Sequence, residues 1–420
     1  MDQQQEKILR KNAIRLLPIL TFAYLINYLD RTNISFAALT MNKDIGLTAT
    51  QYGRGAGIFF LGYCLFEVPS NLALYRFGAR LWIARIMITW GLLSIAMVFV
   101  GGAWSFYVMR FLLGVAEAGF FPGVAFYLAF WFPPQYRARI LAGFLVAIPF
   151  STVVGAPLSG LLLELDGALG LAGWKWLLIL EGLPAVVFGF VVAYLLADRP
   201  EVASWLDPKE REILAEMLAA EPRERERTGI LEAIKDPRVI ICALVQFGFT
   251  LGSYGILFWL PQIIKASGLP NLTVSVLTAI PYAFATAAMI WWALVVDKSG
   301  KKISNLTVAC GLGAVGLVVS VLSDSLAIGL IGLTIALIGI TSARAVFWTI
   351  PTRFMTGVGA ASGLAFINSI GVAGGYFGPE LMGTLKDFTG GYLAGLLTMA
   401  GILAAATLLA ASLKLLIKLE

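Results

Sequence analysis

The segment "LLPILTFAYLINYLDRTNISFAAL" (16–39) places two adjacent charges, Asp30 and Arg31, in the middle of a long apolar run. In a helix that rises about 1.5 Å per residue, this segment is long enough to cross the hydrocarbon core of a bilayer, which is about 30 Å thick. A charge at that depth costs about 2.5–3.5 kcal/mol on insertion scales. Two such charges indicate that the segment does more than anchor the chain.

The whole chain has the composition of an integral membrane protein. Apolar residues make up 59% and charged residues only 13%, whereas soluble proteins average about 45–50% and about 25%. The mean hydropathy is +0.84. In such a protein the placement of Lys and Arg reports the orientation of the loops before it reports ligands, so the formal charge of +6 does not indicate a nucleic-acid partner.

Hydropathy predicts twelve membrane spans and one long polar interruption. The polar stretch, 198–238, follows the sixth span and contains "DPKEREILAEMLAA" (207–220), in which Asp207 is a helix cap and Pro208 the first helical residue. The predicted spans are 16–39, 54–75, 82–101, 104–131, 139–162, 174–197, 239–264, 273–296, 304–322, 326–350, 358–384 and 391–413.

The two halves of the chain repeat each other. "RFGARL" (76–81) and "DKSGKKI" (297–303) follow the second and eighth spans, and "GAPLSG" (155–160) and "GPELMG" (378–383) lie in the fifth and eleventh, offset by 223 residues. The sequence therefore predicts an all-α membrane protein with twelve transmembrane helices in two pseudo-symmetric six-helix bundles. The expected domains are an N-terminal bundle (1–197), a cytoplasmic linker with a short helix (198–238) and a C-terminal bundle (239–420). Lys and Arg concentrate on the side of the linker, which predicts that both termini are cytoplasmic.

The fourth span carries a second charged pair. Arg110 and Glu117 are two helical turns apart and lie on one face, whereas the adjacent Asp30 and Arg31 point about 100° apart and need separate partners. If these four groups face a shared cavity, the arginines can bind an anion and the carboxylates can carry protons. The alternative is that they form structural ion pairs that hold the first and fourth spans together.

The second half has fewer polar candidates. Arg344 in the tenth span has Trp348 one turn later, and the eleventh span contains Asn368. They form either a wall that holds a second substrate group, or a capped helix end and a helix–helix contact. Tyr28 and Tyr63 line the opposite wall or are packing residues. Glu67 and Glu181 lie nearer the ends of their spans, and we interpret them as gate or interface residues.

No constellation for catalysis is present in the sequence. The three cysteines fall in apolar runs and there is no histidine, so we expect no disulfide framework, metal site or imidazole relay. No phosphate-binding loop or nucleophile motif occurs. We expect a protein that is not an enzyme and needs no cofactor.

Five segments of the chain carry a family resemblance: "YLDRTNISFA", "GAGIFFLGYCLFEVPSNL", "RFLLGVAEAGFFPG", "GLAGWKWLLILEGLPA" and "AFINSIG". Together they resemble the major facilitator superfamily, and within it the anion:cation symporter family of tartrate, phthalate, hydroxyphenylacetate and sugar-acid carriers. The resemblance covers essentially the whole chain. It implies proton-coupled uptake of an organic anion by alternating access, in the inner membrane of a bacterium. It implies that Asp30 and Glu117 bind protons and that Arg31 lies near the substrate site. It implies that Arg110 either binds the substrate carboxylate or pairs with Glu117. It also implies that the cavity is lined by Tyr28, Tyr63, Trp348 and Asn368.

Two departures from the family pattern bear on the substrate and the gate. Tyr75 stands where the first cytoplasmic loop usually has an acid, and Ile148 and Pro149 stand where sugar-acid carriers have a glutamine. We therefore expect a monomeric proton symporter of a small dicarboxylate such as tartrate, or of an aromatic acid such as phthalate. Arg110 and Arg344 would each hold one carboxylate. The alternatives are a proton-independent anion facilitator or exchanger, and a hexonate or hexuronate symporter.

Overall fold

The computed structural model describes residues 3–133, 136, 137, 140, 144, 147–219, 235–355 and 357–417, with the backbone alone for 219 and 357–361. Helices dominate these residues, and no strand occurs among them. Ten helices in the described part of the chain are long and apolar enough to cross a membrane. The structure confirms the all-helical membrane fold.

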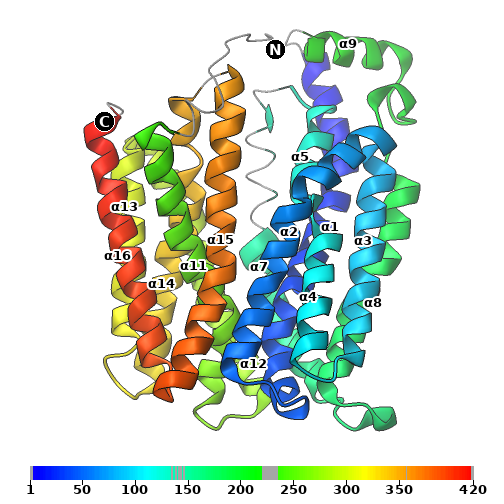
Figure 1. Cartoon of the computed structure of the whole chain (residues 1–420). Coiled ribbons are helices and arrows are strands. Elements are labelled where there is room, and N and C mark those ends of the chain that lie inside the picture. The colour runs from blue at the N-terminus through cyan, green and yellow to red at the C-terminus, as the bar shows by residue number, and fades with distance from the viewer. Residues whose placement is uncertain are drawn as a thin grey trace.

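The N-terminal bundle contains the first six spans, which Figure 1 draws from blue to green. Its helices are α1 (Gln3–Asp44), α2 (Ala49–Phe77), α3 (Ala79–Ala96), α4 (Ala103–Glu117) with α5 (Phe120–Ala129), α7 (Ala147–Leu163) and α8 (Gly173–Leu195). Part of the predicted span 139–162 lies outside the described residues.

The C-terminal bundle contains the other six spans. Its helices are α11 (Pro237–Lys265), α12 (Asn271–Ser299), α13 (Lys302–Val319), α14 (Leu326–Phe347), α15 (Gly357–Thr389) and α16 (Leu393–Leu416). With α4 and α5 counted as one broken span, the described helices supply the twelve spans that the sequence predicts.

The fourth span is broken, although the sequence predicts one helix over 104–131. α4 ends at Glu117, Ala118 adopts an extended ψ of 134°, and Gly119 adopts a left-handed φ of 84° before α5 begins. Gly119 accommodates the left-handed turn, and Pro122 contributes to the break because it has no N–H to donate to the carbonyl of Ala118 in a continuous helix. Glu117 therefore lies at a helix end inside the membrane, where its carboxylate can approach α1.

The internal repeat is visible in the backbone. Gly78 ends α2 with a φ of 89° and Gly300 ends α12 with a φ of 67°, so both repeated glycines terminate the second helix of their bundle. At the interface between the bundles, α2 packs on α15 and α7 packs on α12. In each pair the second helix of one bundle meets the fifth helix of the other, as a two-fold relation requires.

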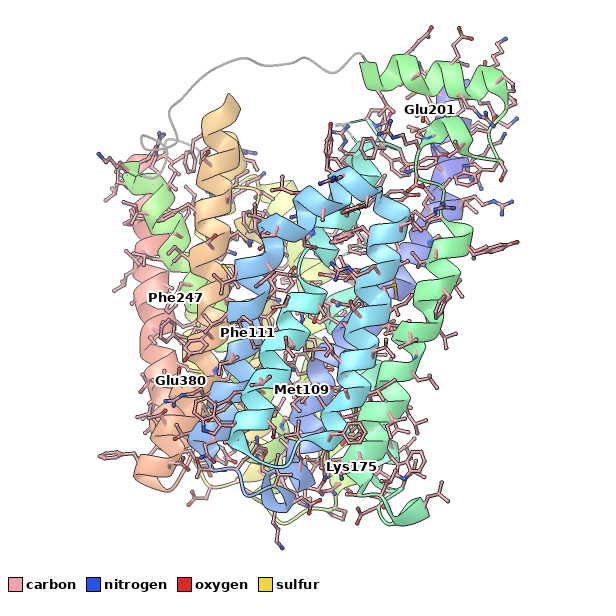
Figure 2. All side chains as sticks on the ribbon, turned by 45° about the vertical axis from the view of Figure 1, so that its right-hand side comes forward. Met109, Phe111, Lys175, Glu201, Phe247 and Glu380 are labelled. Atoms are coloured by element: carbon pink, nitrogen blue, oxygen red, sulfur yellow. The ribbon has the colours of Figure 1, made fainter. Side chains whose placement is uncertain are left out.

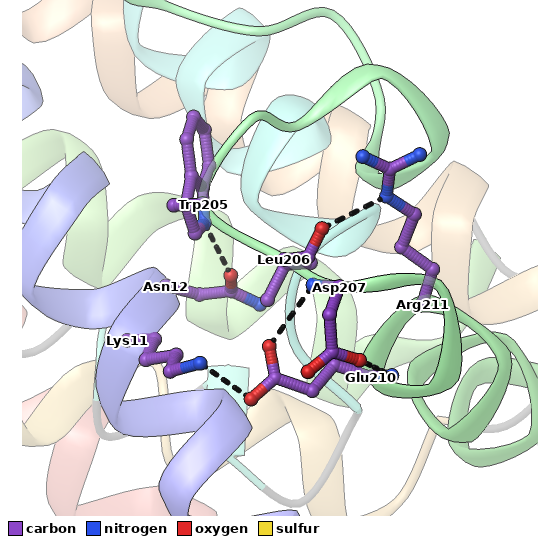
Figure 3. Close-up of polar contacts among 7 residues, drawn as sticks. All are labelled: Lys11, Asn12, Trp205, Leu206, Asp207, Glu210 and Arg211. Atoms are coloured by element: carbon purple, nitrogen blue, oxygen red, sulfur yellow. Dashed lines mark hydrogen bonds and ion pairs between the residues drawn. The ribbon is translucent and has the colours of Figure 1, made fainter.

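A short linker helix, α9 (Pro208–Ala219), packs on the end of the N-terminal bundle that carries the start of α1. It begins at Pro208, as the capping pattern predicts. Lys11 pairs with Glu210, and the indole of Trp205 donates to Asn12 at 3.0 Å (Figure 3). We call this end of the molecule the linker end and the other the opposite end; Figure 2 shows Glu201 at the linker end and Lys175 and Glu380 toward the opposite end.

Polar contacts join the two bundles at the opposite end. Arg54 of α2 forms an ion pair with Glu380 of α15 at 2.9 Å. Asp387 of α15 accepts from the first backbone N–H groups of α2, at 2.7 Å from Thr50. The hydroxyl of Tyr52 donates to the carbonyl of Phe258 in α11 at 3.1 Å. We call these contacts the interbundle seal.

Candidate functional site

The two adjacent charges of α1 have different partners. Arg31 forms an ion pair with Glu117 of α4, to which it donates from Nε at 3.0 Å and also from Nη2. Asn27, one turn earlier on the same face of α1, donates to the same carboxylate oxygen at 2.6 Å. Since α4 ends at Glu117, the carboxylate is held from one side by two donors of α1.

Three aromatic rings surround the guanidinium of Arg31. Its Cζ lies 5.1 Å from the ring centroid of Tyr28, 5.2 Å from that of Phe59 and 5.4 Å from that of Tyr63. Cation–π contacts at such distances stabilise a cation that water does not solvate. The structure thus brings together four residues of the predicted site, namely Tyr28, Arg31, Tyr63 and Glu117.

Asp30 points to another part of the N-terminal bundle. Its Oδ1 accepts hydrogen bonds from the hydroxyl of Ser94 on α3 and from Asn33 at 2.8 Å, and the residue is 2% exposed. Successive helical residues differ by about 100° in direction, which separates Asp30 from the Arg31–Glu117 pair. No salt bridge to Asp30 occurs within the described residues.

Arg110 does not pair with Glu117, which is one of the two roles that the resemblance implies for it. It is fully buried, with Nε 3.4 Å from the carbonyl of Gly55 and Nη2 3.3 Å from that of Ala56, and its Cζ lies 4.9 Å from the ring centroid of Phe59. Seven residues along a helix span about 10.5 Å, so Arg110 and Glu117 share a face without touching. Arg31 takes the place of Arg110 as the partner of Glu117.

The C-terminal wall is built around Arg344 of α14. Its Nη2 donates to the hydroxyl of Ser253 at 2.9 Å, and its Cζ lies 5.9 Å from the ring centroid of Tyr254. The hydroxyl of Tyr282, which interacts electrostatically with Arg344, is buried without a hydrogen-bond partner. A half-buried cation next to an unpaired buried hydroxyl can hold an anion.

The two walls meet at Tyr254, which the sequence analysis missed. Its ring centroid lies 4.4 Å from that of Phe60 of α2. Its side chain interacts with Tyr28 of α1, and both Arg31 and Arg344 act electrostatically on it. The internal repeat was the available signal, because a shift of 223 residues places Asp30 and Arg31 on Ser253 and Tyr254.

Two further predicted residues lie on the C-terminal side. Trp348 directly follows α14 and is half-buried, and its ring is nearly perpendicular to that of Phe347 at a centroid distance of 5.3 Å. Asn368 is half-buried on α15, one turn before Gly371, whose Cα faces the side chain of the buried Gln246. Within the described residues, Arg344 makes its hydrogen bond to Ser253 and its ring contact to Tyr254, and neither Trp348 nor Asn368 is among these partners.

The fold and the polar site between two bundles are those of a membrane carrier, and comparison with known proteins agrees. Residues 20–379 match the family model of the Major Facilitator Superfamily. A protein of Agrobacterium vitis that is provisionally named a tartrate transporter is 50% identical over 401 residues, covering 95% of this chain and 93% of the relative. A quinolone resistance transporter of Acinetobacter baumannii is 41% identical and covers 94% of this chain and 92% of its own length.

Solved structures show the same fold. A bacterial homologue of the human lysosomal transporter Spinster, in an inward-facing and occupied conformation, superposes with a TM-score of 0.77 at 17% identity, covering 94% of this chain and 95% of the other. The chain belongs to the Major Facilitator Superfamily. It is a multi-pass membrane transport protein for a small molecule, and not an enzyme.

Proposed function

We propose that this transporter imports a small organic dianion, a dicarboxylate such as tartrate or an aromatic diacid such as phthalate, together with protons. The observation that carries the proposal is the pair of arginines on opposite bundles, Arg31 and Arg344, which both act on Tyr254 between them. Each guanidinium can donate two parallel hydrogen bonds to one carboxylate. The name of the tartrate relative supports this substrate class.

The ion pair between Arg31 and Glu117 supplies the coupling. Glu117 occupies the donors of Arg31, so a substrate carboxylate has to compete with it for the same guanidinium. A proton on Glu117 removes that competition, because a neutral carboxyl group no longer holds the arginine by charge. Proton binding and anion binding then favour each other, as symport requires.

Asp30 is the second proton-binding residue of the proposal. It is buried beside two hydrogen-bond donors, Ser94 and Asn33, and interacts electrostatically with Glu117 and Arg110. A buried carboxylate without a cation in contact is neutralised most readily by a proton. We further propose that the linker end is cytoplasmic, since Lys and Arg concentrate there, and that the interbundle seal closes the external end in one state of an alternating-access cycle.

The test is uptake by the purified full-length protein in liposomes, with and without an inward proton gradient. The panel contains tartrate, phthalate, hydroxyphenylacetate and a sugar acid. We expect gradient-stimulated uptake of a dicarboxylate that is lost in Asp30→Asn. Saturable uptake that ignores the gradient would support a facilitator or exchanger, and selective uptake of the sugar acid would support a hexonate carrier.

A second function is favoured by one observation, the 41% identity to a quinolone resistance transporter. The aromatic residues around Arg31 and Tyr254 offer stacking surfaces for a planar ring. Export would appear as a lower quinolone accumulation in cells that produce the protein. Unchanged accumulation, together with dicarboxylate uptake in liposomes, excludes this candidate.

A further inference from the structure

A third buried carboxylate, Glu181 of α8, lies outside the site described above. It is 4% exposed, and its Oε1 accepts from the hydroxyl of Ser159 on α7 at 2.6 Å. Its Oε2 is buried and has no hydrogen-bond partner. The sequence suggested a gate or an interface for this residue, but the structure places it between two helices of the same bundle.

Glu181 has no cation to compensate a negative charge. Within the described residues no salt bridge involves it, and the titratable group that interacts with it is another acid, Asp30 of α1. An isolated buried carboxylate is among the most expensive groups to ionise in a protein. If Glu181 only accepted a hydrogen bond that joins α7 and α8, a glutamine with its neutral amide could do the same. The carboxyl group therefore needs a different explanation.

The helices that carry Glu181 and Asp30 are in close contact. α8 packs on α1 and α3. Gly182, the next residue, lies so close to α3 that a Cβ on it would be 3.2 Å from the Cβ of Ser94, which is the hydroxyl donor to Asp30. The serine that holds Asp30 thus also touches the backbone beside Glu181.

Glu181 lies at a different depth from the other two carboxylates, Asp30 and Glu117. Glu181 is eight residues from the start of α8 at the opposite end, which corresponds to about 12 Å along the helix. Asp30 is fourteen residues from the end of α1 at the same side, and Glu117 is fourteen from the start of α4, which corresponds to about 21 Å. Glu181 is therefore the member of the series nearest the water at the opposite end.

We propose that Glu181 is the entry carboxyl of the proton path and passes protons from the opposite end to Asp30. The two carboxyl groups are not in hydrogen-bond contact, so the proton moves along bridging water molecules between them. One O–H bond breaks at Glu181, each bridging water gives up one proton as it takes another, and one O–H bond forms at Asp30, so the negative charge moves from Asp30 to Glu181. A proton from the water at the opposite end then restores Glu181. The inference rests on the proposed proton coupling and adds the residue through which the protons enter.

The variant that tests it is Glu181→Gln, which keeps an acceptor for Ser159 and removes the titratable group. With tartrate as the probe in liposomes, we expect gradient-driven uptake to fall at least tenfold, while tartrate counterflow, which needs no net proton movement, stays within twofold of the wild type. Glu164→Gln is the matched control, because Glu164 is an exposed glutamate just beyond α7 at the same end. Glu181→Asp, which keeps the carboxyl group, should recover part of the gradient-driven uptake.

The outcomes separate the two proposals. Wild-type uptake that ignores the gradient overturns the proposed symport and this inference with it. Gradient-driven wild-type uptake that Glu181→Gln preserves overturns only the role of Glu181. Infrared spectra need no substrate: we expect Glu181→Gln to remove one protonated-carboxyl band at neutral pH, and an unchanged spectrum would count against the inference even if the variant transports nothing.

Discussion

The two bundles share a fold but differ in where they keep charge. Among the described residues, the N-terminal bundle fully buries Asp30, Arg110, Glu117 and Glu181 inside the membrane, whereas the C-terminal bundle presents the half-buried Arg344. A shift of 223 residues places the four charged positions on Ser253, Leu333, Ile340 and Ala404. The difference teaches that a repeated scaffold need not repeat its chemistry: one half buries the carboxylates that we propose to bind protons, and the other keeps hydroxyls and one half-buried cation.

Among variants that test this difference between the bundles, we expect Arg31→Gln to have the largest effect on transport. The change leaves Glu117 buried with Asn27 as its donor, and losing one partner of a buried ion pair costs about 3–5 kcal/mol. We expect liposome uptake to fall at least 100-fold. Lys43→Gln, which neutralises an exposed cation on the same helix, is the control, and uptake within threefold of the wild type in Arg31→Gln would contradict the site.

Arg344→Gln tests the C-terminal side and should have a smaller effect. A hydrogen bond to a charged group contributes about 1.5–3 kcal/mol, so we expect KM for a dicarboxylate to rise by about tenfold to a hundredfold. KM for a matched monocarboxylate should change less than twofold. An equal rise for both substrates would mean that Arg344 does not hold the second carboxylate.

Arg110→Met tests whether Arg110 has the substrate-binding role that the resemblance implies for it. The guanidinium contacts two carbonyls at 3.3 and 3.4 Å and is sealed from solvent, so we expect Tm to change by a few degrees while KM stays within threefold. A rise in KM of tenfold or more would instead return Arg110 to the substrate site.

Arg54→Gln probes the interbundle seal and should have the smallest effect. The Arg54–Glu380 pair is partly exposed, and such pairs contribute less than about 1 kcal/mol, so the balance between sealed and open states should shift less than about fivefold. Spin labels at the exposed positions Lys43 and Phe388, with the native cysteines replaced by alanine, measure the distance distribution across this end. A wholly open population in this variant would show that the other seal contacts contribute little.

Much of the fold could be predicted from the sequence, because hydropathy and the internal repeat act over whole spans. The sequence does not predict the break after Glu117, since the hydropathy of 104–131 is continuous and a proline such as Pro122 also occurs inside unbroken helices of this chain. For the candidate site, helical geometry predicted that Asp30 and Arg31 need different partners. It could not tell that Arg31 rather than Arg110 meets Glu117, because that contact depends on how α1 and α4 are rotated against each other. Tyr254 was missed because its role comes from the opposite bundle.

A tryptophan beside the interbundle seal gives the molecule an optical signal of its own. The indole of Trp259 donates to the carbonyl of Pro379 at 3.0 Å, and its ring stands edge-on to Tyr52 of the other bundle at a centroid distance of 5.2 Å. Separation of the bundles at this end would remove Tyr52 and let water reach a fully buried indole. The emission of Trp259 should therefore shift to longer wavelength as the seal opens, so that turnover can be followed by fluorescence in the unlabelled protein, with Trp259→Phe as the blank.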